Sequence, residues 1–263
     1  MNLPERARAA APAAPLPTIG ISAIIPVYNE AETIEEIVRR LEQVPVIRQI
    51  VVVDDYSRDG TQAIVQRLVA EGRVLAVFHE RNRGKGAALR SGLPLVREEY
   101  LAIQDADLEY DPRDFMKMAE LIERYDAQVI YGSRFLGADR SGMLWTHYLG
   151  NRGLTLLFNL MFQRWITDME TCYKLFRTSL LRQIGIDNDR FDVDPELTAK
   201  VVRAGTKSTK PRCRMLAAPT WRARRLSRAT PSLRSKHCGA IAAGARSRSP
   251  SRWASHAGKP NSI

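Results

Sequence analysis

Between residues 20 and 205, short apolar runs alternate with segments of helical spacing, and this alternation limits the possible folds more than any other feature. Apolar runs rich in β-branched residues predict buried strands. We expect strands over 21–28, 49–56, 74–80, 100–107 and 127–135. Apolar residues at helical spacing between them predict helices over 31–41, 59–72, 84–96 and 112–125. Strands that alternate with helices predict an α/β fold, a Rossmann-like and mostly parallel sheet with helices on both faces.

Polar clusters follow four of the predicted strands. They are Tyr28-Asn29-Glu30, Asp54-Asp55, Asp105 to Glu109, and Gly132-Ser133-Arg134. In a parallel sheet the carboxyl ends of the strands meet at one edge, where ligands bind in a crevice. The sequence therefore predicts one functional site built from four separate segments.

The acids of the third cluster stand at alternate positions. Asp105, Asp107 and Glu109 would point the same way in extended backbone, and crowded carboxylates repel one another unless a cation lies among them. They could form a solvated turn before the helix at Pro112, which is the better interpretation of the tripeptide alone. They could also bind Mg²⁺ or Mn²⁺, which prefer carboxylate oxygens and the phosphates of a substrate.

Seven motifs, in order, resemble those of the family 2 inverting glycosyltransferases. They are PVYNE, VVVDDYSRDGT, NRGKGAALRSG, QDADLEYDP, GSRF, DMETCYKLFR and RFDVDPELTAKVVRAG. The last two resemble the polyprenyl-phosphate sugar transferase branch, which includes dolichol-phosphate mannose synthase. The resemblance covers about residues 20 to 205 and implies a GT-A fold.

The resemblance also implies roles for individual residues. The donor-binding set would be Pro26, Tyr28, Glu30, Asp54, Asp55, Lys85 and Asp105. The metal ligands, for Mg²⁺ or Mn²⁺, would be Asp105, Asp107 and Glu109. The catalytic set would be Asp105, Asp107, Arg134, Lys174 and Arg177. Of these, Arg134, Lys174 and Arg177 would face donor or acceptor phosphates.

The function implied is transfer of a sugar from a nucleoside-diphosphate sugar, of the GDP-mannose or UDP-glucose type, to a polyprenyl or dolichyl phosphate with inversion at C1. The alternatives are a glycan or protein acceptor, or an inactive remnant that only binds nucleotide sugar. An acceptor phosphate is already anionic at neutral pH, so this chemistry needs no histidine base. We accordingly expect no catalytic partner for His79 or His147.

Two further segments leave alternatives open. Asp192, Asp194 and Glu196 could bind substrate or could simply begin a helix, where acids are favourable. The apolar segment 153–165 predicts a helix that is either part of the core or lies in a membrane interface beside a lipid acceptor. It is too short to span a bilayer.

Composition adds three expectations about the surroundings of the protein. Residues 1–18 are rich in Ala and Pro and predict a disordered leader rather than a secretory signal. The three cysteines have neither zinc-site nor disulfide-framework spacing. We therefore expect a cytoplasmic protein, and the polyprenyl-phosphate acceptor that the resemblance implies would associate it peripherally with the cytoplasmic membrane face.

The charge of the chain belongs to its last segment. From Thr206 onward there are ten arginines, four lysines and no acidic residue, a formal charge of +14, whereas the first 205 residues carry −3. Such a tail usually indicates binding to nucleic acid or anionic membrane. Residues 19–205 are thus predicted to form the catalytic domain, and 206–263 a basic, disordered tail.

The tail also has an unusual property in reverse translation. Permitted codons from Thr206 onward, each read one nucleotide earlier, encode YKIYEAPVSYAGRTYVEGKKI, and even the single-codon residues Met215 and Trp221 comply. This string resembles the segment that follows RAG in the family. We hypothesise that a single-nucleotide deletion near codon 205 put the tail out of frame. Its charge would then be accidental, and we expect no specific nucleic-acid partner.

Overall fold

The structure is a computed structural model. It describes residues 17–133, 145–163, 166, 168, 171–190, 192–207 and 213–217. Contacts between Cα atoms divide the chain into two units, Met1–Arg224 and Arg225–Ile263, and every described residue belongs to the first.

The described strands form one seven-stranded sheet in the order β3-β2-β1-β4-β6-β5-β7. Their bounds are β1 Ile21–Val27, β2 Ile47–Asp54, β3 Leu75–Phe78, β4 Tyr100–Ile103, β5 Val129–Ser133, β6 Lys174–Arg177 and β7 Cys213–Ala217. β6 runs antiparallel to both of its neighbours, and every other pair is parallel. The predicted mostly parallel sheet is therefore confirmed. β6 is the one reversed strand, and the sequence did not predict it because Lys174–Arg177 has only two apolar residues, which lie between basic ones.

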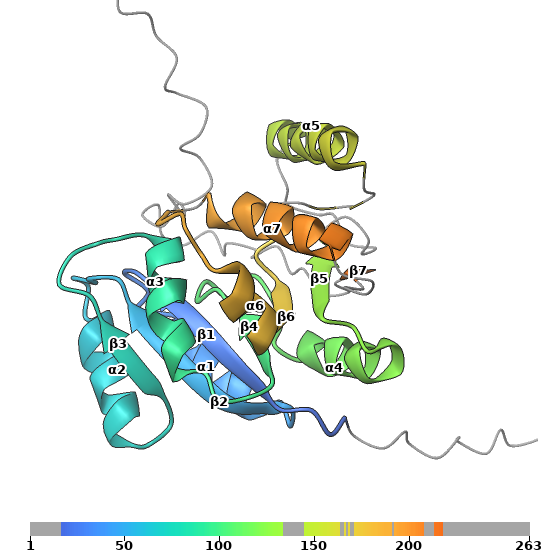
Figure 1. The fold of residues 1–263 in the computed structure, drawn as a ribbon. Coiled ribbons are helices and arrows are strands. Elements are labelled where there is room, and N and C mark those ends of the chain that lie inside the picture. The colour runs from blue at the N-terminus through green and yellow to red at the C-terminus, as the bar shows by residue number, and fades with distance from the viewer. Residues whose placement is uncertain are drawn as a thin grey trace, which may run out of the picture. The chain divides into compact units, whose positions relative to one another are not determined.

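Helices cover both faces of the sheet (Figure 1). Their bounds are α1 Ile34–Glu42, α2 Thr61–Ala70, α3 Lys85–Gly92, α4 Asp114–Tyr125, α5 Trp145–Phe162, α6 Thr178–Ile184 and α7 Val193–Lys207, with a 3₁₀ turn at Leu93–Leu95. One core cluster joins α1, α2 and α4 to the sheet, and a second joins α3, α6 and α7 to its other face. Because both faces are covered, the central strands are apolar almost throughout, as strands buried on both sides must be.

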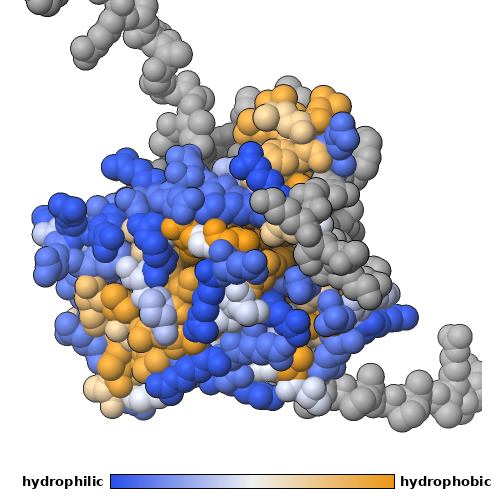
Figure 2. Space-filling view, in the orientation of Figure 1, coloured by the Kyte–Doolittle hydropathy of each residue, from blue (hydrophilic) through white to orange (hydrophobic). Residues whose placement is uncertain are grey.

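Helix α5 packs against α7 and leaves much of its own apolar surface in solvent. Phe158 is buried and forms a small cluster with Ile166, against which Ala199 and Val202 of α7 pack. The exposed large apolar residues of α5 are Leu154, Leu156, Leu157, Leu160 and Met161. Figure 2 shows this apolar surface over α5. Among the described helices, none has the length and hydropathy required to cross a bilayer.

The region around the predicted domain boundary contains two regular elements. Helix α7 continues past Gly205 to Lys207, and β7 at Cys213–Ala217 pairs in parallel with β5. The sequence predicts no regular element after Gly205, so β7 is a difference from that expectation. The division at 205 stays a prediction, and the expected leader lies outside the described residues except for Pro17 and Thr18.

Candidate active site at the carboxyl edge of the sheet

The ends of β1, β2 and β4 meet as the sequence predicts. Val27 pairs with Asp54 at the ends of β1 and β2, and the amide of Asp55 donates to the carbonyl of Val27 at 2.8 Å. The amide of Gln104, which follows β4, donates to the carbonyl of Ile24 at 3.0 Å. The polar segments after these three strands therefore share one edge of the sheet.

The carboxylates after β4 influence one another strongly. Burial, and after it the nearby charges of Asp105 and Glu109, together raise the pKa of Asp107 to about 7. The amide of Glu109 donates to Asp107 Oδ1 at 3.0 Å, which is a turn contact. A carboxyl group held near other carboxyls in this way gains stability from a cation, because the cation removes the repulsion.

Two of these acids fit a divalent ion that is also held by substrate phosphates. Mg²⁺ commonly binds through one or two carboxylates and keeps its other positions for phosphate or water. Among the described residues, no group of three or more His, Cys, Asp or Glu side chains is arranged to hold a metal by itself. Asp105 and Asp107 supply the two carboxylates that a metal shared with a substrate diphosphate would need, and Glu109 is exposed beside them.

Two lysines and a further aspartate lie behind Asp105. Lys85 Nζ is 2.9 Å from Asp105 Oδ1 and 3.4 Å from Asp194 Oδ2, and Lys174 Nζ is 2.6 Å from Asp194 Oδ1. Burial acts to lower the pKa of Lys85, but Asp105 and Asp194 outweigh it and hold that pKa well above its ordinary value. Burial likewise acts to raise the pKa of Asp194, and the two lysines reverse the shift.

This arrangement gives the acids near the start of α7 contacts that neither interpretation predicts. Asp194 is buried and pairs with lysines. The carboxylate of Glu196 accepts hydrogen bonds from the amides of Asp187 and Asn188 at 2.7 and 2.8 Å, while Asp192 is exposed. Asp194 and Glu196 therefore make ion pairs or hydrogen bonds within the fold, whereas Asp192 faces solvent.

The predicted donor-binding residues of the first loop lie at the surface of the site. Pro26, Tyr28 and Glu30 are each half-buried. The amide of Glu30 donates to Thr61 Oγ1 at 2.9 Å, and the amide of Asn29 donates to Ser57 Oγ at 2.9 Å. The loops that follow β1 and β2 are thus fixed to each other.

The paired acids after β2 are both buried, and both accept hydrogen bonds from neighbouring loops and helices. Asp54 Oδ1 accepts hydrogen bonds from the Ser57 amide and from Gln62 Nε2, at 3.0 and 2.9 Å. Asp55 accepts from the amides of Arg83 and Gly84, at 2.8 and 2.7 Å. In the folded chain Asp55 therefore holds the loop that leads to Lys85, a role that the sequence did not predict.

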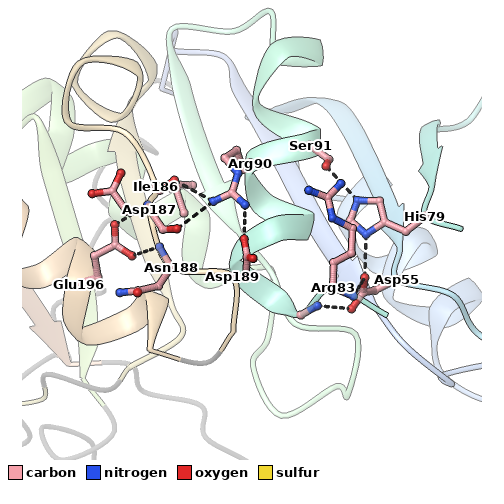
Figure 3. A network of polar contacts seen from close by, with 11 residues as sticks. Asp55, His79, Arg83, Arg90, Ser91, Ile186, Asp187, Asn188, Asp189 and Glu196 are labelled. Atoms are coloured by element: carbon pink, nitrogen blue, oxygen red, sulfur yellow. Dashed lines mark hydrogen bonds and ion pairs between the residues drawn. The ribbon is translucent and has the colours of Figure 1, made fainter. Parts of the chain in front are cut away.

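His79 completes the Asp55 contacts (Figure 3). Its Nδ1 is 2.7 Å from Asp55 Oδ1 and its Nε2 is 2.9 Å from Ser91 Oγ. The expectation that His79 has no catalytic partner stays a prediction, and the structure adds that His79 links the end of β2 to α3. Its partners are buried or half-buried, which fits a structural tie.

The start of α3 is pressed against the segment before α7. A Cβ added to Gly84 would lie 2.5 Å from the carbonyl oxygen of Asp189, and one added to Gly86 would lie 2.0 Å from that of Asn188. Arg90 Nη1 donates to the carbonyls of Ile186 and Asp187 at 3.0 and 3.2 Å (Figure 3). The glycines on either side of Lys85 were the sequence signal for this close approach.

Residues 22–185, more than half of the chain, match the family profile described as Glycosyl transferase family 2. The chain belongs to glycosyl transferase family 2. The relationship predicted from the seven motifs is confirmed, and the domain described above is a glycosyltransferase domain.

Several curated relatives of this glycosyltransferase domain are polyprenyl-phosphate sugar transferases. Dodecaprenyl-phosphate galacturonate synthase of Rhizobium johnstonii is 25% identical over 194 residues, 72% of this chain and 56% of that protein. UDP-N-acetylglucosamine–dolichyl-phosphate N-acetylglucosaminyltransferase of Methanococcus voltae is 30% identical over 176 residues, 60% of this chain and 70% of that protein. Undecaprenyl-phosphate 4-deoxy-4-formamido-L-arabinose transferase of Pseudomonas syringae is 36% identical over 119 residues, 43% of this chain and 35% of that protein. The match thus spans from about a third to 70% of these relatives.

Solved structures of GT-A glycosyltransferases share the fold. Glucosyl-3-phosphoglycerate synthase of Mycobacterium tuberculosis, in complex with Mn²⁺, UDP and phosphoglyceric acid, aligns with a TM-score of 0.60 at 18% identity, over 79% of this chain and 72% of that one. Staphylococcus aureus TarS 1-349, in complex with UDP, aligns with a TM-score of 0.56 at 20% identity, over 77% of this chain and 59% of that one. The predicted GT-A fold is confirmed.

Two residues of the predicted catalytic set are not placed at this edge. β6 is antiparallel to β4, so Lys174 pairs with Ile103 at the carboxyl end of β4 while Arg177 pairs with Tyr100 at its other end. Arg177 is 2.6 Å from Glu99 there, and the expectation that it joins the site of the glycosyltransferase domain differs from the structure. Arg134 lies outside the described residues.

Proposed function

We propose that this chain derives from, and is built as, a metal-dependent transferase that moves a sugar from a nucleoside-diphosphate sugar to a polyprenyl phosphate with inversion at C1. The observation that carries the proposal is the crowding of carboxylates after β4, where burial and then the charges of Asp105 and Glu109 raise the pKa of Asp107 to about 7. The relatives whose names specify polyprenyl phosphates support the acceptor class. Neighbours of the same fold in complex with UDP support a nucleotide donor.

In this proposal the chain's residues divide into three tasks. Asp105 and Asp107 would hold Mg²⁺ or Mn²⁺, with Glu109 available beside them. Pro26, Tyr28 and Glu30 would contact the base and ribose of a GDP-mannose or UDP-glucose type donor. Asp54 and Asp55 would act indirectly, because their carboxylates already bond to the loops around them.

A divalent ion and lysine side chains would stabilise the negative charge of the donor phosphates. A bound divalent ion supplies Lewis-acid stabilisation of the departing nucleoside diphosphate. Lys85 lies beside Asp105 and is the described cation best placed to add to that charge. Lys174 is fully buried, so it would act through Asp194 rather than by direct contact with an acceptor.

Work at a lipid acceptor would place the protein at the cytoplasmic face of a membrane. Peripheral attachment is the mode we propose, since α5 presents exposed leucines and a methionine next to the glycosyltransferase core. An amphipathic helix of this kind can lie in the headgroup region without crossing the bilayer.

The first test is thermal unfolding of the chain with GDP-mannose or UDP-glucose, each with and without Mn²⁺. A ligand at 100 times its dissociation constant adds about 2.7 kcal/mol, which raises the midpoint by a few degrees. We expect a metal-dependent rise that Asp107→Ala abolishes and that Glu120→Ala, an exposed acid of α4, leaves intact. No rise with either donor would contradict the donor site.

A second candidate function is nucleotide-sugar binding without turnover. The basic segment after Gly205, with its alternative reading frame, favours it, because elements expected on the acceptor side would be missing. Transfer of labelled sugar to polyprenyl phosphate separates the two: donor binding without transfer would identify the remnant. Transfer to a glycan or protein instead would identify the other acceptor class.

A further inference from the structure

Four charged side chains from four different elements form a buried cluster beside the proposed metal ligands. Lys85 begins α3, Asp105 follows β4, Lys174 begins β6, and Asp194 lies in the first turn of α7. Lys174 is fully buried, and the side chains of Lys85 and Asp194 are 7% and 8% exposed. Two ammonium groups and two carboxylates make the cluster electrically neutral.

Lys85 is shared between two carboxylates in this cluster. Its Nζ lies 2.9 Å from Asp105 Oδ1 and 3.4 Å from Asp194 Oδ2. The other oxygen of Asp194 accepts from Lys174 at 2.6 Å, so Asp194 bridges the two lysines. Asp105 is the only member of the cluster that is also a proposed metal ligand.

A cation at Asp105 creates a conflict that Asp194 can resolve. An ammonium group and a divalent cation compete for the same carboxylate, because each is stabilised by its negative charge. A buried ammonium that loses its carboxylate without replacement is strongly destabilised. Asp194 Oδ2 lies 3.4 Å from Lys85 Nζ, so Lys85 keeps a carboxylate partner when a cation binds Asp105.

We propose that Asp194 is a positioning residue that supplies this second carboxylate to Lys85 and so leaves Asp105 able to ligate a divalent cation. The inference rests on the proposed metal-dependent function. It assigns Asp194 no contact with metal, donor or acceptor. It explains why an acid is buried at the start of α7 although the exposed Asp192 already offers a favourable charge at that helix end.

The inference is tested by equilibrium binding of Mn²⁺ alone, with the free ion measured by electron paramagnetic resonance. This experiment does not require the enzyme to transfer a sugar. We expect Asp194→Asn to raise the dissociation constant at least about tenfold, because Lys85 then has only Asp105 as its partner. The double variant Lys85→Met/Asp194→Asn removes the competitor and keeps the net charge, so its constant should return to within about threefold of the wild type. Glu196→Gln, an acid lost from the same turn of α7, is the matched control and should leave Mn²⁺ binding unchanged.

An unchanged constant for Asp194→Asn would overturn the inference. So would a double variant that binds as weakly as the single one, since that result indicates general damage. If Asp194→Asn does not fold, as judged by circular dichroism, Lys85→Met alone decides: it must bind Mn²⁺ at least as tightly as the wild type, and weaker binding would overturn the inference. Wild-type binding that is absent, or that survives Asp107→Ala, would instead overturn the proposed metal site itself.

Discussion

Asp107 lies in an environment unlike that of an ordinary surface acid. Its pKa is raised to about 7, first by burial and then by Asp105 and Glu109. Protons and Mn²⁺ therefore compete for this carboxylate near neutral pH. We expect Mn²⁺ to bind more tightly as the pH rises from 6 to 8, and Asp107→Asn to lose most of both the binding and its pH dependence. Calorimetric titration at several pH values measures this, and a pH-independent affinity in the wild type would contradict it.

The same shift has a consequence for stability without added metal. An acid whose pKa is raised on folding binds more protons in the folded than in the unfolded chain between its ordinary value, about 4, and about 7. The free energy of unfolding should therefore fall as the pH rises through that range. Asp107→Asn should flatten this part of the profile in urea unfolding, whereas a profile identical to that of the wild type would show that Asp107 does not titrate there.

At the residue scale, the sequence predicted which segments form the site better than it predicted what each side chain does. The segments after β1, β2 and β4 meet because parallel pairing fixes where the strands end. Asp54 and Asp55 could be assigned to the donor only by resemblance, and their bonds to Gln62 and to the Arg83–Gly84 amides depend on packing between distant segments. No local pattern marks such partners in advance.

Among the elements, α3 depends on its close contact with the segment before α7. Gly86→Ala would place a methyl group 2.0 Å from the carbonyl oxygen of Asn188. We expect a loss of about 1–3 kcal/mol in unfolding free energy, as for other overpacked sites. Gly153→Ala in α5, where a Cβ meets nothing within 4 Å, should be neutral or slightly stabilising. Equal stability of the two variants in urea unfolding would contradict the contact.

Helix α5 is the element expected to meet a membrane. Leu160 and Met161 are 69% and 70% exposed, and a charge at these positions should weaken insertion into the headgroup region. We expect Leu160→Glu/Met161→Glu to reduce cosedimentation with anionic vesicles severalfold, and Val69→Glu on α2 to have no effect. A basic tail also binds anionic vesicles. The same variants should therefore also be measured in the frame-restored chain, which lacks that tail. Undiminished binding of the α5 variant there would exclude this helix as the contact.

Most of the strands and helices could be predicted from the sequence, but β6 could not. Five strands were predicted because they lie in apolar runs, and the helices between them because their apolar residues have helical spacing. β3 and β4 are as short as β6, but β6 was missed because Lys174–Arg177 has only two apolar residues, which lie between basic ones. Lys174 and Arg177 lie at opposite ends of this strand, and its antiparallel direction places Lys174, not Arg177, beside the carboxyl end of β4.

At the scale of the whole molecule, the tail is the feature that most affects what the chain can do. In the alternative reading frame, the residues at 213–217 would be VSYAG, at the positions where β7 pairs with β5. We expect the frame-restored chain to unfold at a higher temperature, because a β-branched and aromatic strand suits an edge of the sheet. Restoration should also abolish the salt-sensitive binding to DNA that a +14 segment confers. A coding sequence without the alternative frame would refute the frameshift hypothesis directly.

The contact between α3 and residues 186–190 is made largely through main-chain atoms on the loop side. Gly84 and Gly86 approach carbonyl oxygens, the Ala87 amide donates to the carbonyl of Asp189, and Arg90 donates to two more carbonyls. The ion pair between Arg90 and the carboxylate of Asp189 is the side-chain exception. Main-chain atoms are the same whatever residues a loop contains. Apart from Asp189, which pairs with Arg90, divergent relatives could therefore change the sequence of this loop, whereas an inserted or deleted residue would shift the carbonyls that α3 contacts. When this loop is grafted between family members, conserving its length should therefore matter more than conserving its amino-acid sequence.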